Sequence, residues 1–350
     1  MGQVAQIIHL PILEGLSDRY EVTALCDVSP RLLGLMGDRY GVDRLYKDAG
    51  ALIEKEPIDA AFVLTSDEYH ADCIVAAAKN KRHVFVEKPM CLTRAEAREI
   101  IRAKDQAGIK VMDAYMRRFA PAFLRAAQEV ERLDRINYVR IRDIIGRNQL
   151  IIDQSSVVHG FDDVPEAVVR DRADRAQRLV SEAIGEAPQD LRAAYRLLCG
   201  LSSHDLSAMR EIIGFPNRVV AAAQWNGGRF ISAIFEYDDY YASFETGVDG
   251  QRRFDAHIEV YGETRSLKIQ YDTPYIRHLP TTLSVSETVG QAHNETVIRP
   301  TFKDPYTYEI EHFHDAVTRD LEPKTTAEDF TADLEIIAMI TDALKRDHPG

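Results

Sequence analysis

The stretch 83–90, H-V-F-V-E-K-P-M, constrains the fold of this chain more than any other. Residues 84–86 are β-branched or aromatic, and such a run predicts a short buried strand. The strand must stop at Glu87-Lys88-Pro89, because Pro89 lacks a backbone donor and favours an extended conformation at Lys88. An acid and a base are therefore expected at a strand end.

A helix is predicted directly after this strand. Thr93 and Glu96 form the T-x-x-E pattern of a capping box, and the helix is expected from Arg94 to Ala107, ending at Gly108. A strand end, a fixed lysine and a helix start together describe a ligand site at the carboxyl edge of a parallel sheet. The alternative is a solvated Glu87–Lys88 pair on a turn, and spacing alone leaves both open.

Composition narrows the class of protein. A length of 350 residues predicts two domains, and 45% hydrophobic with 28% charged residues is ordinary for a globular protein. The net charge of −13 argues against nucleic acid or an anionic membrane as a partner. The four cysteines lack metal-type spacing, and His312 and His314 fall on different helix faces, so we expect no metal site. We expect the thiols to be reduced and the protein to be cytoplasmic.

The segment V-F-V-E-K-P, preceded by a histidine-bearing helix and a β-α-β pattern, resembles the Gfo/Idh/MocA oxidoreductases. This family includes glucose-fructose oxidoreductase and inositol dehydrogenase. The resemblance covers nearly the whole chain; E-K-P is its most specific part, and the C-terminal half matches by pattern. It implies an N-terminal doubly wound Rossmann-like α/β domain at 1–116 and a C-terminal α+β domain with an open, mainly antiparallel sheet at 117–350.

The start of the chain departs from the family pattern. A strand at Glu21–Cys26 ends in Asp27, where the family has an acid that binds ribose hydroxyls. Gly2 falls on the second glycine of the family's glycine-rich turn and Ala5 on its third small position, so the first glycine and the first strand are missing. We expect the native protein to carry further residues upstream; the rival interpretation is a truncated chain with weakened cofactor binding.

Other polar residues of the first domain have two interpretations each. His70 opens a helix through Lys79, near the nicotinamide-ribose end in the family, but a capping or packing role is favoured. Arg117-Arg118-Phe119 matches the family's R-R-F crossover, where the arginines meet an oxygen of substrate or cofactor or form salt bridges.

The second domain is expected to open with a half-exposed strand at Asn137–Ile144. A helical insertion follows at about 146–198, interpreted as a lid over the site or an oligomer contact. Further strands are expected at Arg218–Trp225, Phe230–Tyr237, Tyr241–Glu245, Ala256–Tyr261 and Ser266–Tyr271. The family packs the open face of this sheet against another subunit, so a homodimer or homotetramer is implied.

His204 matches the catalytic histidine of the family, which often lies in D-x-x-x-H. Here the acid four residues earlier is replaced by Gly200, so another group must orient the imidazole or the mechanism differs. Asp143 and Asp163 are candidates by loop position, while Asp205 should point elsewhere on the helix.

The resemblance implies an NAD(P)-dependent oxidoreductase that moves hydride between nicotinamide and a hydroxyl-bearing carbon of a sugar, cyclitol or related polyol. Lys88 would polarise the reacting oxygen, and His204 would be the general base. Asp27 favours NAD, since it would repel a 2′-phosphate, and Arg31 leaves NADP open. The expected cofactor contacts are Gly2, Val4, Ala5, Asp27, Thr65, His70, Glu87, Lys88 and Arg118, and the expected substrate contacts are Lys88, Asp143, His204 and Tyr275.

Two further classes remain as alternatives. One is a non-catalytic nicotinamide-binding regulator of the same fold, which the missing acid and missing strand favour. The other is a scaffold protein without cofactor, which only the short start favours. Retention of Lys88 and His204 together favours the enzyme.

Overall fold

The computed structural model describes residues 1–347, and these fold into two compact units. The first unit contains Met1–Ala114, Ser156–Gly185 and Glu309–Thr331. The second contains Tyr115–Ser155, Glu186–Tyr308 and the chain from Ala332 onward. Two segments distant in sequence thus join the N-terminal part, so both units are discontinuous along the chain. The single boundary at residue 116 stays a prediction.

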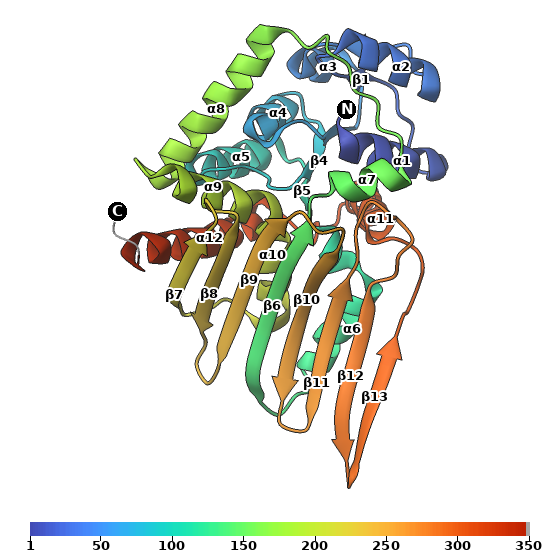
Figure 1. Cartoon of the computed structure of the whole chain (residues 1–350). Helices are drawn as coiled ribbons and strands as arrows, with labels where there is room; N and C mark the ends of the chain where they lie inside the picture. The colour runs from blue at the N-terminus through green and yellow to red at the C-terminus, as the bar shows by residue number, and fades with distance from the viewer. Residues whose placement is uncertain (348–350) are drawn as a thin grey trace. The chain divides into compact units, whose positions relative to one another are not determined.

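The first unit holds two short parallel sheets (Figure 1). Strand β1 (Leu25–Cys26) pairs with β2 (Leu45–Tyr46). Strands β3 (Ala60–Val63), β4 (His83–Glu87) and β5 (Val111–Ala114) form the other sheet, with β4 in the middle. All pairings are parallel, which confirms the predicted Rossmann-like α/β class.

Sequence signals explain where the helices of this unit begin and end. Thr93 and Glu96 form the predicted capping box, and Gly108 adopts φ 67° after the last turn. Ser29 caps another helix by accepting the backbone N–H of Leu32. The helices are η1 (Ala5–His9), α1 (Leu10–Gly15), α2 (Pro30–Tyr40), α3 (Ala49–Lys55), η2 (Asp67–Tyr69), α4 (His70–Lys79), α5 (Arg94–Ala107) and α8 (Glu166–Ile184), with most of α11 (Pro305–Thr318).

The predicted helical insertion is shared between the units. Helix α7 (Gln149–Ser155) belongs to the second unit, whereas the chain 156–185, including α8, packs on the first. Tyr69 donates to Asp171 of α8 at 2.7 Å, and Arg175 of α8 donates to Asp72 of α4 at 2.5 Å. Polar side chains therefore attach α8 to the start of α4.

The second unit is built on one eight-stranded sheet in the order β13-β12-β11-β10-β6-β9-β8-β7 (Figure 1). Only β6 and β9 pair in parallel, so the sheet is mixed and mainly antiparallel, as expected. Strands β12 and β13 were not predicted, although Leu283 and Val285 alternate with polar residues. The strands are β6 (Ile136–Gly146), β7 (Arg218–Trp225), β8 (Phe230–Glu236), β9 (Tyr241–Asp249), β10 (Phe254–Gly262), β11 (Arg265–Tyr271), β12 (Thr282–Val289) and β13 (Ala292–Ile298).

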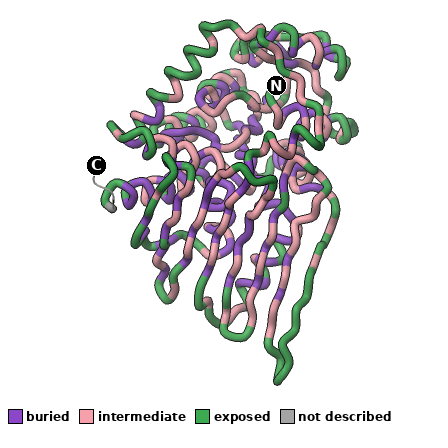
Figure 2. The backbone as a smooth tube through the Cα atoms, viewed as in Figure 1, coloured by how far each residue is buried: buried purple, intermediate pink, exposed green. Residues whose placement is uncertain are grey.

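Burial alternates along these strands (Figure 2). Val139, Ile141 and Phe244 are fully buried, and helices α6 (Pro121–Val130) and α10 (Ser203–Ile213) pack against the sheet. Tyr138 and Tyr241 remain 39% and 50% exposed. An open antiparallel sheet with one covered face produces this alternation. Also in this unit are η3 (Met116–Phe119), α9 (Gln189–Leu197), η4 (Leu198–Ser202) and most of α12 (Ala327–Asp347).

Within residues 1–347, the helices are too short or too polar to cross a bilayer.

Candidate functional site

Strand β4 delivers Glu87 to the carboxyl edge of its sheet. The Glu87 carboxylate lies 2.7 Å from Nε2 of His9, which is fully buried, and accepts the backbone N–H of Lys88 at 3.2 Å. Burial would raise the pKa of Glu87, but the His9 hydrogen bond and the charges of His9 and Lys88 lower it below its usual value. Glu87 therefore remains an acceptor-only carboxylate beside Lys88.

The Lys88–Pro89 turn is fixed by a histidine. The peptide bond between Lys88 and Pro89 is cis. Ring nitrogens of His70 lie 2.9 Å from the carbonyl oxygen of Pro89 and 3.0 Å from that of Thr65. A neutral imidazole has one N–H and can donate to one carbonyl, whereas an imidazolium donates to both. His70 thus joins the turns that follow β3 and β4.

Asp27 follows β1, as the sequence predicts. Its carboxylate accepts the amino group of Met1 and, at 2.9 Å, the backbone N–H of Ser29. Both oxygens of this carboxylate therefore have a donor within the chain.

The segment 161–163 lies over the start of α2. Asp163 accepts the Ser29 hydroxyl at 2.5 Å and the Arg31 backbone N–H at 2.8 Å. The Arg31 guanidinium reaches Asp162 at 3.1 Å and stacks 4.3 Å from the Phe161 ring. The hydrogen bond from Ser29 lowers the pKa of Asp163, so the beginning of α2 already carries an anion. Asp163 was predicted as a partner for His204; its hydrogen bonds are to the α2 start.

The first residues form a helix start. Helical structure begins at Gln3 and includes Val4 and Ala5, and the side chain of Gln6 bonds the backbone of His159 in both directions at 2.9 Å. A Cβ added at Gly2 would meet no atom within 4 Å. The space beside Gly2 is therefore open.

The second unit contains a buried ionic cluster that the sequence did not predict. The Arg117 guanidinium bonds Asp143 at 3.1 Å and Asp205, and both carboxylates have fully buried side chains. Burial raises the pKa of Asp205 well above its usual value; Arg117 opposes the shift and Asp143 adds to it. One guanidinium cannot neutralise two carboxylates, so the cluster favours retention of a proton on Asp205.

His204 lies in the first turn of α10 and is 7% exposed. Its ring packs edge-on against that of Tyr115, with centroids 6.1 Å apart. Gly200, in η4, has space beside it, because an added Cβ would meet nothing within 4 Å. The acid expected four residues before His204 is absent, but the fold has room for it.

The remaining candidates also lie in the second unit. Arg118 pairs with Glu211 and donates to the Ser207 hydroxyl at 3.0 Å, both on α10. Tyr275 lies in the loop between β11 and β12. The expected site residues are thus divided: Gly2, Val4, Ala5, Asp27, Thr65, His70, Glu87 and Lys88 belong to the first unit, and Arg118, Asp143, His204 and Tyr275 to the second.

Two residues that sequence reasoning missed are prominent in this geometry. No motif marks His9 as the partner of Glu87, because 78 residues separate them. Arg117 was noted as part of R-R-F, but its pairing with two buried acids depends on the packing of β6 and α10. Local sequence spacing therefore gives no indication of the His9–Glu87 contact or of the Arg117 ion pairs.

These features define an α/β dinucleotide-binding class: parallel strands whose carboxyl ends present Asp27, Thr65 and Glu87–Lys88. Residues 2–115 match the family described as GFO_IDH_MocA, "Oxidoreductase family, NAD-binding Rossmann fold". The matched residues are similar to the Gfo/Idh/MocA oxidoreductases.

The named relatives have modest sequence identity to this chain. Myo-inositol 2-dehydrogenase of Thermotoga maritima is 34% identical over 131 residues, which is 37% of this chain and 39% of that protein. The chain therefore spans well under half of that relative in the matched region. scyllo-Inositol 2-dehydrogenase (NAD(+)) of Bacillus subtilis is 22% identical over 325 residues, 88% of this chain and 82% of the relative.

Solved structures share the fold of the whole chain. Scyllo-inositol dehydrogenase from Lactobacillus casei, solved with bound NAD(H) and scyllo-inositol, superposes with a TM-score of 0.70. The match covers 99% of this chain and 95% of that one at 18% identity. This similarity confirms the fold class.

Proposed function

We propose that this protein is an NAD(P)-dependent oxidoreductase that moves hydride between nicotinamide and a carbon bearing a hydroxyl group. The observation that carries the proposal is the polar edge formed by Asp27, Thr65 and Glu87–Lys88 at the ends of parallel strands, in residues that match the model of an NAD-binding family. The nicotinamide would supply or accept the hydride. The chain would bind and orient the substrate and exchange a proton with it.

For the cofactor we favour NAD over NADP. Asp27 would accept ribose hydroxyls, and Asp163 is a second carboxylate at the start of α2. A 2′-phosphate near these two groups would be repelled. Gly2, Val4 and Ala5 would hold the pyrophosphate by backbone contacts, and Arg31 is the residue that would favour NADP.

Two residues are proposed as catalytic. Lys88 would place its charge against the substrate oxygen and stabilise negative charge there, while the His9–Glu87–Lys88 contacts and His70 hold its turn. His204 would take the proton from the hydroxyl during oxidation. Tyr275 is proposed to bind the substrate. Arg118, whose side chain bonds Glu211 and Ser207 on α10, is proposed to contact the cofactor.

The proposed substrate class is a cyclitol, sugar or related polyol. The named relatives act on inositols, and the T. maritima and B. subtilis proteins are both inositol dehydrogenases by name. We further propose a homodimer or homotetramer formed through the open face of the eight-stranded sheet, where Tyr138 and Tyr241 are exposed.

The test is cofactor titration followed by turnover. NADH and NADPH fluorescence titrations come first, then oxidation rates with myo-inositol, scyllo-inositol and aldoses. Lys88→Ala and His204→Ala should each lower turnover by roughly 10²–10⁴ while leaving the fold intact. The exposed Lys79→Ala and His293→Ala are matched controls and should match the unchanged protein. Near-normal turnover of either site variant would overturn the assigned roles, and failure to bind either nucleotide would overturn the function.

A second candidate function is a nicotinamide-binding regulator without turnover. Gly200 favours it, because the acid that would assist His204 is absent although there is space for it. Tight NADH binding with no turnover in the polyol screen would favour this candidate.

A further inference from the structure

The chain 156–165, which we call the strap, lies on the starts of helices in the first unit. It leads into α8, and both belong to the same compact unit as Met1–Ala114 (Figure 1). The Gln6 side chain donates to the carbonyl of His159 and accepts its backbone N–H, both at 2.9 Å. Since Gln6 is buried, the strap is attached firmly to the first helical segment of the chain.

A second set of contacts attaches the strap to the start of α2. Asp163 accepts the Ser29 hydroxyl at 2.5 Å and the Arg31 backbone N–H at 2.8 Å. The Phe161 ring lies 4.3 Å from the Arg31 guanidinium and packs against the apolar cluster formed mainly by α1, β1 and α2. The start of α2 follows Asp27, so the strap lies beside the carboxylate where the proposed function puts a nucleotide ribose.

Helix α8 is attached in turn to the start of α4. Arg175 donates to Asp72 at 2.5 Å and to Asp171 at 3.0 Å, and its guanidinium lies 4.8 Å from the centre of the Tyr69 ring. The Tyr69 hydroxyl donates to Asp171 at 2.7 Å. We call these four residues the latch. Arg175 contacts each of the other three, so the latch depends on its guanidinium.

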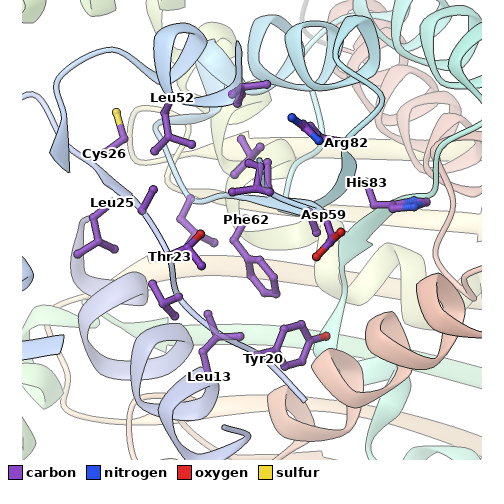
Figure 3. A pocket seen from close by; sticks show the side chains of 18 of the residues that line it. Leu13, Tyr20, Thr23, Leu25, Cys26, Leu52, Asp59, Phe62, Arg82 and His83 are labelled. Carbon is purple, nitrogen blue, oxygen red and sulfur yellow. The ribbon is translucent and has the colours of Figure 1, made fainter. Parts of the chain in front are cut away.

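The strap is separate from the cavity of about 790 Å³ between the chain 20–26 and strand β3 (Figure 3). Leu25 and Phe62 are on the walls of this cavity. Of the residues in 1–347 that line it, none lies in the strap. What the strap covers is therefore the start of α2 beside Asp27, and not this cavity.

We propose that the strap is a gate for the cofactor. A dinucleotide would reach the edge beside Asp27 only when the strap leaves the start of α2. The latch would set how often the strap does so, because the strap runs directly into α8. This inference rests on the proposed function and adds a control of cofactor exchange to it. Lid segments that close over a ligand commonly limit such exchange.

The gate predicts a specific kinetic pattern. The hydrogen bonds of the strap join residues of the chain to one another, so closure needs no nucleotide and opening must precede both entry and exit. The latch joins α8 to α4, whereas Asp27 precedes α2. Loosening the latch should therefore destabilise the closed strap equally with and without a nucleotide. Both rate constants should rise by the same factor, and Kd should stay nearly constant.

The experiment measures NADH association and dissociation by stopped-flow fluorescence for the whole chain and three variants. Arg175→Met removes the guanidinium of the latch and should raise both rate constants about tenfold, with less than about a twofold change in Kd. Tyr69→Phe loses only the bond to Asp171 and should raise both about threefold. Arg170→Met is the matched control on the same helix, since its ion pair at 3.2 Å is with Glu166 of α8 itself. Its rates should equal those of the unchanged protein.

Two kinetic results overturn the gate. One is a pair of rate constants in Arg175→Met equal to those of Arg170→Met. The other is a dissociation rate constant that rises alone, because the latch would then act on affinity. Amide hydrogen exchange of 157–164 without nucleotide is a second measurement: faster exchange in Arg175→Met than in the control supports the gate, and equal exchange overturns it.

The outcome for the proposed function is separate. Failure of every form to bind NADH would overturn the proposed function and the gate with it. NADH binding with unaltered rates overturns the gate alone.

Discussion

The Arg117 cluster permits a quantitative prediction about stability. Arg117 is 3% exposed and is the cation contacted by two carboxylates with fully buried side chains, Asp143 and Asp205. Arg117→Met keeps most of the side-chain volume but leaves both acids without that charge. Breaking a buried ion pair on one side costs about 3–5 kcal/mol, so the free energy of unfolding should fall by about that amount at pH 7.

The pH dependence follows from Asp205. Its pKa is higher in the folded protein than its usual value, so the native state binds more protons than the unfolded state. Stability contributed by this group therefore falls as pH rises from about 4, the unfolded value, toward the raised folded value. Without Arg117, which lowers it, the pKa of Asp205 rises further, so the deficit of the variant should grow from pH 5 to pH 8.

The assay is urea unfolding followed by circular dichroism at pH 5, 6.5 and 8. Arg117→Met/Asp205→Asn should recover much of the loss, because a neutral amide has no charge to bury. Arg125→Met is the control: its side chain is 53% exposed and its contact with Glu129 is 3.9 Å, so the change should be under about 1 kcal/mol. A loss below about 1 kcal/mol for Arg117→Met, or one independent of pH, would refute the reasoning.

Three further changes test other parts of the molecule. Asp163→Asn removes the anion at the start of α2 and should tighten NADPH binding roughly fivefold while leaving NADH binding nearly unchanged, as fluorescence titration would show. Gly200→Asp places an acid in open space four residues before His204; it favours a charged imidazole, so the acidic limb of the turnover profile should move to higher pH. His9→Phe removes the hydrogen bond to Glu87 and should cost about 1–3 kcal/mol by urea unfolding at pH 7, and this cost should shrink as the pH falls through the lowered folded pKa of Glu87.

Local signals predicted the elements well. The capping box and Gly108 predicted α5 with both ends correct, and α8 (Glu166–Ile184) lies inside the stretch of about 146–198 that was predicted to be helical. Helix and strand periodicities act within a few residues, so they are present in the sequence itself. The predicted strands Arg218–Trp225 and Phe230–Tyr237 match β7 and β8, two largely apolar runs that a short turn separates.

Long-range contacts were beyond the sequence. Strands β12 and β13 are mostly polar; β12 pairs with β11 and β13 pairs with β12, and these pairings extend over chain that lacks a strong apolar pattern. The attachment of 156–185 to the first unit depends on polar pairs such as Ser29–Asp163, whose partners are 134 residues apart. Local spacing carries no information on such contacts.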